Sequence, residues 1–193
     1  MTRKDIERIA IESNKLLPVE LEALVSREED ASLRSPGTAA HYYRFLYLLT
    51  KELKPSLSVE LGTHTGISAA CLAEGYPEGC VITVDCIQRV LDISRRPNVE
   101  YFHQDSLKLL NIAEKSIDVF FSDTYHDGIK PKQEYELYLP YIKEGGILMF
   151  DDISLLPEMK VFWENFKPQG EKFELPVHGW AGFGIVIKDG ACS

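Results

Sequence analysis

VELGTHTGISAACLAEG, residues 59–75, is the stretch of this sequence that decides the fold. A strand-forming run ends at Glu60 and Leu61, two glycines follow four positions apart, and a series of small residues begins directly after them. This order predicts a buried strand, a tight turn and a helix. Gly62 and Gly66 carry no Cβ atom, so backbone N–H groups at the turn can meet a ligand, and the helix N-terminus favours an anionic group.

Composition and charge limit the class of protein. The chain has 193 residues, of which 45% are hydrophobic and 26% charged, as expected for one globular domain. Its net charge of −9 argues against a nucleic-acid partner, which requires clustered Lys and Arg. The sequence lacks a membrane-spanning apolar run, and its opening MTRKDIERIA is charged where a signal peptide is apolar. We therefore expect a cytoplasmic protein that binds neither nucleic acid nor membrane.

Apolar runs and helical patterns alternate along most of the chain. The expected strands lie at residues 57–61, 81–84, 99–102, 117–121, 147–150, 173–177 and 182–187. The expected helices lie at residues 3–15, 19–27, 36–53, 66–74, 106–113, 131–143 and 156–166. Strands that are apolar on both faces and alternate with helices predict an α/β fold with a mainly parallel sheet of seven strands and helices on both faces. Only HGWAG separates the last two strands, so they must form a C-terminal antiparallel hairpin.

Acidic residues end three consecutive strands of the predicted sheet. In a doubly wound sheet the ligand lies beyond these carboxyl ends. Glu60 suits an ammonium group better than a pyrophosphate, Asp85 in ITVDC is placed for ribose hydroxyls, and Asp105 in FHQDS for an exocyclic amine. Each acid alone could be only a helix N-cap. Together they favour a ligand that contains an ammonium, a ribose and an adenine, which is S-adenosylmethionine.

Five segments together resemble the motif series of class I S-adenosylmethionine-dependent methyltransferases. They are VELGTHTGISAA, ITVDC, VEYFHQDSL, IDVFFSDTYHD and EGGILMFDDI, within residues 38–188. The first is similar to the turn of the catechol O-methyltransferase group, of the macrocin O-methyltransferases and of the cephalosporin-hydroxylase-like proteins. The resemblance implies a Rossmann-like fold, with residues 35–193 as the cofactor-binding methyltransferase domain. Residues 1–34 would then be a helical segment that caps the acceptor or forms a homodimer interface.

The resemblance also implies roles for individual residues. Glu60 would lie near the methionyl ammonium, Ser68 at the methionyl carboxylate and Asp85 at the ribose. The implied cofactor-binding set is Glu60, Gly62, Thr63, His64, Gly66, Ser68, Asp85, Cys86, Asp105, Ser106 and Asp123, with Asp105 and Ser106 at the adenine.

A second group of acids follows the fourth and fifth predicted strands. Asp123, Asp151 and Asp152 are expected to converge beside the reacting methyl group, and carboxylates so crowded repel one another unless a cation lies between them. Oxygen ligands suit Mg²⁺ or another divalent cation, and the related families hold a metal at the matching positions. His126 matches a lysine base of the catechol group, so Asp123 and His126 are the predicted catalytic residues. Alternatively, His126 is a loop histidine without a role and Asp152 a helix cap.

These features predict a metal-assisted O-methyltransferase that acts on a small hydroxylated molecule, either a sugar or a phenol. Two other functions remain open from the sequence. One is a non-catalytic protein of the same fold that serves binding or assembly. The other is a nicotinamide-dependent oxidoreductase, which Glu60 and the missing middle glycine of the turn disfavour.

Overall fold

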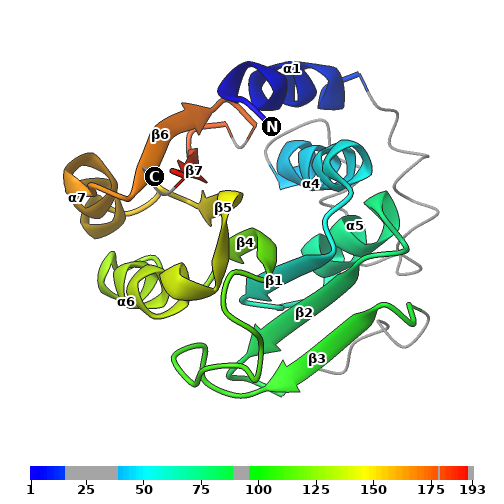
Figure 1. The fold of residues 1–193 in the computed structure, drawn as a ribbon. Coiled ribbons are helices and arrows are strands. Elements are labelled where there is room, and N and C mark those ends of the chain that lie inside the picture. The colour runs from blue at the N-terminus through cyan, green and yellow to red at the C-terminus, as the bar shows by residue number, and fades with distance from the viewer. Residues whose placement is uncertain (16–38, 89–95, 178, 191–193) are drawn as a thin grey trace.

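A seven-stranded mixed sheet forms the centre of the computed structural model, which describes residues 1–15, 39–88, 96–177 and 179–190 (Figure 1). The described helices are α1 (Arg3–Ser13), α4 (Ala39–Leu53), α5 (Ile67–Gly75), α6 (Ile129–Tyr138) and α7 (Pro157–Asn165), with a 3₁₀ turn η2 (Leu139–Tyr141). The strands are β1 (Leu57–Leu61), β2 (Cys80–Asp85), β3 (Val99–His103), β4 (Ile117–Ser122), β5 (Ile142–Asp151), β6 (Gly170–Leu175) and β7 (Phe183–Lys188).

The strand order β3-β2-β1-β4-β5-β7-β6 confirms the predicted α/β fold. β1 pairs in parallel with β2 and with β4, and β4 pairs in parallel with β5. β7 runs antiparallel to both β5 and β6, which is the predicted C-terminal hairpin. The order in which the strands are added therefore changes side between β1 and β4, and a doubly wound sheet opens a ligand-binding crevice at this point.

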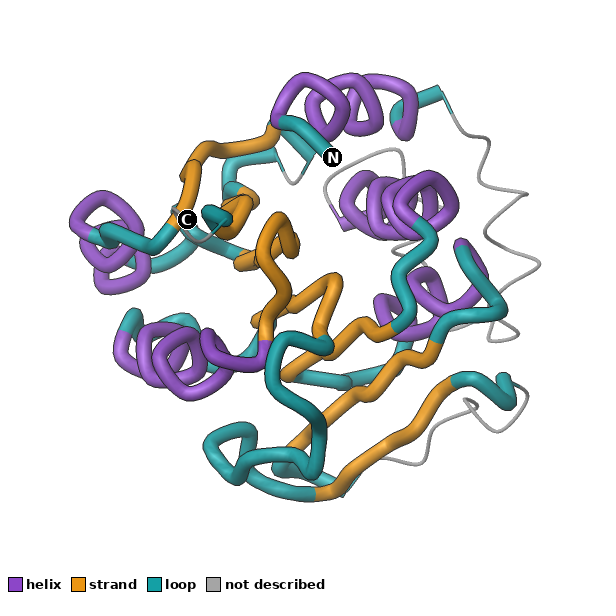
Figure 2. Tube along the Cα trace, in the orientation of Figure 1, coloured by secondary structure: helices purple, strands orange, loops and turns teal. Residues whose placement is uncertain are grey.

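Helices cover both faces of the sheet (Figures 1 and 2). On one face, α1, α4 and α5 pack through Ile9, Phe45 and Leu72 against a buried cluster that includes Phe121 and Met149. The other face holds α6 and α7, whose aromatic residues form a second cluster with the sheet. Each strand of the centre is thus buried on both sides, as its continuous apolar sequence predicts.

The predicted helix over residues 106–113 is wrong, because the structure has only turns there. In a continuous helix, the Lys108 carbonyl would accept a hydrogen bond from the Ile112 N–H. Instead, the Gln104 side chain donates to the Lys108 carbonyl, and the Ile112 N–H donates to Leu110. The Gln104 side chain thus replaces the backbone N–H that would donate to the Lys108 carbonyl in a helix.

The predicted helix over residues 131–143 ends earlier than expected, at Tyr138. Leu139 still has helical angles, with φ of −50° and ψ of −41°, but Pro140 after it has no N–H to donate to the carbonyl four residues earlier, so the α-helical hydrogen bonds end here. The chain passes through η2 and enters β5 at Ile142, so the fifth strand is longer than the sequence pattern indicates.

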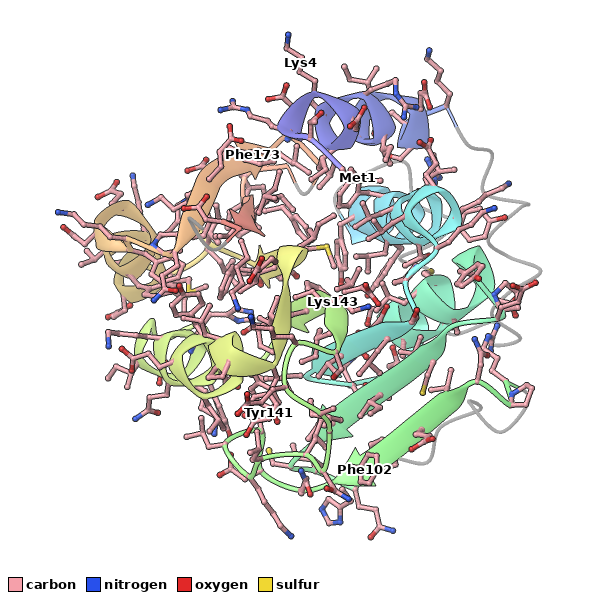
Figure 3. The ribbon with its side chains drawn as sticks, viewed as in Figure 1. Met1, Lys4, Phe102, Tyr141, Lys143 and Phe173 are labelled. Atoms are coloured by element: carbon pink, nitrogen blue, oxygen red, sulfur yellow. The ribbon has the colours of Figure 1, made fainter. Side chains whose placement is uncertain are left out.

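The N-terminal helix packs onto the domain. Ile6 and Ile9 of α1 are fully buried, and Arg8 forms an ion pair of 2.6 Å with Glu52 of α4. The Arg3 guanidinium lies 4.9 Å from the ring of Phe173, which Figure 3 labels on β6 beside α1. The second predicted helix, residues 19–27, lies outside the described residues, so the capping or dimerisation role of residues 1–34 stays a prediction. None of the described helices is both long and apolar enough to cross a bilayer.

Candidate cofactor and acceptor site

A cavity of about 430 Å³ opens at the carboxyl ends of β1, β2 and β4. Its lining residues are Gly62, His64, Val84, Asp85, Cys86, Ile87, Asp105, Ser106, Asp123, Thr124, Tyr125 and Lys130. Seven of them belong to the predicted cofactor set. The described residues also line a groove of about 450 Å³ between α6 and α7, which contains no predicted site residue.

The glycine turn is shaped by its neighbouring strand. Gly62 has a φ of +100°, and a Cβ atom on it would lie 1.7 Å from the carbonyl oxygen of Asp123. The close approach that requires this glycine is therefore to the backbone at the end of β4. Gly66 begins α5 with a φ of +83°, and His64 between them has a φ of +44°, a conformation that is costly for a residue with a side chain.

Glu60 is fully buried behind the turn. Thr83 donates a hydrogen bond to Oε2 of Glu60, and the Thr63 hydroxyl, 2.7 Å from that of Thr83, completes the chain. Oε1 of Glu60 is buried without a hydrogen bond of normal geometry among the described residues. Burial raises the pKa of Glu60 to about 8, against the opposing effect of the Ser68 and Thr83 hydroxyls. Glu60 does not line the cavity, whereas the sequence placed it at the ligand.

The raised pKa of Glu60 predicts a pH dependence of stability. Between pH 4.5, the ordinary pKa of a glutamate, and about pH 8, Glu60 keeps a proton in the folded protein that it releases in the unfolded chain. The stability that this proton provides is fully present below pH 4.5 and is lost as the pH rises toward 8. We therefore expect the free energy of unfolding to fall over this range in the wild type and to fall less in Glu60→Gln. Urea denaturation across the range measures both, and parallel curves would contradict the assignment.

Asp85 is held at the end of β2 by two backbone groups. Its Oδ2 accepts a hydrogen bond of 2.9 Å from the His64 N–H, and its Oδ1 accepts one of 2.8 Å from the Ile87 N–H. Both carboxylate oxygens are thereby oriented at the cavity wall and keep further lone pairs for a ligand. This arrangement suits the two adjacent hydroxyls of a ribose.

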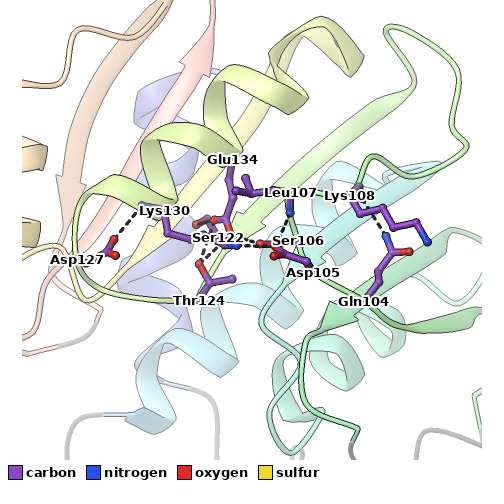
Figure 4. A network of polar contacts seen from close by, with 10 residues as sticks. All are labelled: Gln104, Asp105, Ser106, Leu107, Lys108, Ser122, Thr124, Asp127, Lys130 and Glu134. Carbon is purple, nitrogen blue, oxygen red and sulfur yellow. Dashed lines mark hydrogen bonds and ion pairs between the residues drawn. The ribbon is translucent and has the colours of Figure 1, made fainter.

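Asp105 and Ser106 line the cavity from the end of β3. Asp105 Oδ1 accepts hydrogen bonds from Lys130 Nζ at 2.6 Å and from the Leu107 N–H at 2.9 Å. The Lys130 ammonium is the main cause that lowers the pKa of Asp105. Ser106 is buried and donates to Glu134 of α6. Figure 4 shows these side chains meeting between β3, β4 and α6.

The predicted catalytic residues lie together at the ends of β4 and β5. His126 Nε2 lies 3.5 Å from Asp123 Oδ1 and 3.6 Å from Asp152 Oδ2. Burial lowers the pKa of His126, because it disfavours the charged imidazole. The carboxylates of Asp123, Asp152 and Asp151 have the opposite and larger combined effect, so the pKa is raised above 6.5. Nε2 is buried and makes no hydrogen bond of normal geometry in the described part of the chain. Asp152 has a φ of +55°, and such strain is typical of functional sites.

The structure does not gather all three predicted metal ligands. Across the described ranges, no group of three His, Cys, Asp or Glu side chains has the arrangement of a preformed metal site. Asp151 is the buried last residue of β5, and its charge contributes to the raised pKa of His126 beside those of Asp123 and Asp152. The oxygens of Asp123 and Asp152 nevertheless lie within 4 Å of one point, the His126 Nε2 atom. Their chemistry fits a hard divalent cation.

Sequence reasoning missed several residues of the cavity. Thr124 and Tyr125 follow Asp123 directly, so their position after a strand end was a usable signal. Lys130 and Glu134 lie in α6, and nothing in their local sequence points to the cavity. Trp180, in the HGWAG turn between β6 and β7, is 69% exposed. His178 lies outside the described residues.

Comparisons with known proteins agree with this geometry. A methyltransferase domain family matches residues 59–153. The chain is 29% identical over 150 residues to the probable caffeoyl-CoA O-methyltransferase 3 of Dictyostelium discoideum. The aligned region covers 70% of this chain and 59% of that protein. The chain thus spans about three fifths of the length of this curated relative.

Solved structures share the fold over almost the full chain. An O-methyltransferase from Bacillus cereus in complex with SAH (S-adenosylhomocysteine) has a TM-score of 0.66 at 21% identity, covering 95% of this chain and 97% of that one. The SAH-bound methyltransferase PaMTH1 of Podospora anserina has a TM-score of 0.67 at 16% identity, covering 98% and 97%. These findings identify residues 59–153 as a methyltransferase domain and the chain as similar to S-adenosylmethionine-dependent methyltransferases, whose fold it shares.

Proposed function

We propose that this protein transfers a methyl group from S-adenosylmethionine to a hydroxyl group of a small acceptor. The observation that carries the proposal is the cavity at the strand ends, which is lined by the glycine turn, the oriented Asp85 carboxylate and Asp123. His126 is not a lining residue, but its Nε2 lies 3.5 Å from Asp123 Oδ1, so Asp123 connects the cofactor cavity to the acid-base pair.

The residues present are assigned to four groups of the cofactor. Oε1 of Glu60 lies behind the glycine turn and outside the cavity wall, and it has no hydrogen bond of normal geometry among the described residues; we assign it to the methionyl ammonium. Asp85 offers oriented oxygens to the ribose, with Cys86 beside it in the wall. Asp105 and Ser106 would meet the adenine edge. Ser68, buried in the first turn of α5, would bind the carboxylate, since a helix N-terminus favours an anion.

The cofactor supplies an electrophilic methyl group on a sulfonium. The protein must hold the acceptor oxygen in line with the methyl carbon and remove the hydroxyl proton, and positioning provides much of such an acceleration. His126 Nε2 accepts that proton when the imidazole is neutral. Asp123 and Asp152 then stabilise the imidazolium that forms, as their effect on the His126 pKa indicates.

We also propose that a divalent cation such as Mg²⁺ binds at Asp123 and Asp152, with Asp151 as the adjacent third carboxylate. A metal at this point would bind the acceptor hydroxyl and lower its pKa. The oxygen-only donors support a hard cation, and affinity should be modest because Mg²⁺ keeps several waters. The acceptor is best described as a phenol, since the relatives are named for a caffeoyl-CoA substrate and Tyr125 exposes its ring at the cavity.

Calorimetric titration with S-adenosylmethionine, SAH and NAD tests the cofactor proposal. We expect both sulfur compounds to bind and NAD to show no affinity. Asp85→Ala should weaken binding by about 10- to 100-fold, because it removes hydrogen bonds to a charged group. Asp118→Asn is the matched control, since Asp118 pairs with Lys143 away from the cavity. Binding of NAD alone would refute the proposal.

A further inference from the structure

Glu134 is a buried carboxylate for which the proposed reaction has no use. It is fully inaccessible to solvent and extends from α6 toward the ends of β3 and β4 (Figure 4). Ser106 Oγ donates to Oε1 at 2.6 Å, and Ser122 Oγ donates to Oε2 at 2.7 Å. Thr124 Oγ1 lies 2.9 Å from Oε1 and 3.1 Å from Oε2. Three hydroxyl groups therefore converge on one carboxylate.

Burial raises the pKa of Glu134, while the three hydroxyl groups and Lys130 favour its ionised form. When Glu134 is ionised, the direction of each hydrogen bond is fixed. An ionised carboxylate only accepts, and a hydroxyl has a single proton to donate. Ser106 and Thr124 commit their protons to Glu134 and keep only oxygen lone pairs for other partners. Both residues also line the cavity, Ser106 after β3 and Thr124 after β4. Lys130 also lines the cavity, and its ammonium donates one hydrogen bond to Asp105 Oδ1 at 2.6 Å.

We propose that Glu134 makes the base-binding end of the cavity a hydrogen-bond acceptor, so that it selects a purine with an exocyclic amine over one with a carbonyl at the same position. The inference rests on the proposed function, because it assumes that the adenine lies at Asp105 and Ser106. Glu134 is on this view a positioning residue, which acts on the ligand through two hydroxyl groups.

Replacement by glutamine changes the polarity while keeping the shape. The amide oxygen of Glu134→Gln can still accept from one hydroxyl, but its NH₂ group donates to another. The hydroxyl that receives this bond is free to point its proton into the cavity. A ligand with a carbonyl should then gain a partner that the wild type denies it.

The experiment compares the binding of SAH with that of S-inosylhomocysteine, in which a carbonyl replaces the 6-amino group. We expect the wild type to prefer SAH by at least about tenfold, and Glu134→Gln to reduce this preference to about threefold or less. Calorimetry at neutral pH gives both dissociation constants. Their ratio is the readout, because a loss of stability alone weakens both ligands together.

Asp118→Asn is the control for neutralisation of a partly buried carboxylate that accepts hydrogen bonds. Asp118 accepts hydrogen bonds from the Leu57 N–H at 3.1 Å and from Lys143 Nζ at 2.6 Å, near the amino end of β4. This variant should keep the wild-type ratio even if it is less stable.

A Glu134→Gln protein that folds and keeps the wild-type ratio would overturn the inference. If that variant does not fold, Thr124→Val replaces it: a reduced preference supports the inference, and an unchanged one overturns it. A wild type that binds neither compound would instead remove the proposed function itself.

Discussion

Gly62→Ala is expected to destabilise the protein by about 3 to 5 kcal/mol, the sum of a steric clash and an unfavourable backbone conformation. The new Cβ atom would lie 1.7 Å from the carbonyl oxygen and 2.6 Å from the carbonyl carbon of Asp123. Both belong to backbone, so relief requires β1 and β4 to move apart. That movement displaces the Asp123 carboxylate, and we expect cofactor binding to fall with stability. Urea denaturation and calorimetric titration measure the two effects.

Gly145→Ala is the matched control for this substitution. Gly145 also has a positive φ, of +74°, but a Cβ atom there would meet nothing within 4 Å. It should cost only about 1 kcal/mol, the strain of the backbone conformation. If the two alanine variants lose equal stability, steric contact with β4 is not the reason for the glycine at position 62.

The same glycine shows how far the sequence predicts the site. Its spacing from Gly66 correctly indicated a turn between β1 and α5, because strand, turn and helix are consecutive in the chain. The sequence could not indicate that the missing side chain makes room for Asp123, a residue of a distant strand. The acids at the strand ends were predictable for a related reason, since parallel strands bring their carboxyl ends to one edge.

Contacts between distant side chains explain most of what the sequence did not predict. Ser106 and Glu134 belong to different elements and meet only after the sheet is assembled. The helix expected after Asp105 fails because Gln104 takes a carbonyl that a helix would use, and the periodic pattern of apolar residues does not contain that bond. The length of β5 depends similarly on Pro140, whose missing N–H limits α6.

His126→Ala is expected to lower the rate of methyl transfer by about 10²- to 10⁴-fold, the usual contribution of a general base. The wild-type rate should rise with pH as the imidazole loses its proton, with a midpoint above 6.5 because the neighbouring carboxylates raise the pKa of His126. The alanine variant should lose this pH dependence and still bind SAH as the wild type does. His126→Lys should recover part of the rate, since a lysine base occupies the matching position in the catechol group. Steady-state rates across the pH range measure these effects once an acceptor is known.

Substitution of a carboxylate beside His126 distinguishes two mechanisms, one in which a metal assists the base and one in which the base acts alone. Without a cation, Asp152 serves only to stabilise the imidazolium, and Asp152→Asn should move the pH midpoint downward with little change in the rate at high pH. With a bound cation, the same variant loses a charged ligand, so the rate should fall at every pH and excess Mg²⁺ should restore part of it. Removal of divalent cations with EDTA gives an independent measurement on the wild type. Full activity in EDTA would exclude the metal and leave His126, held 3.5 Å from Asp123 and 3.6 Å from Asp152, as the base that acts without it.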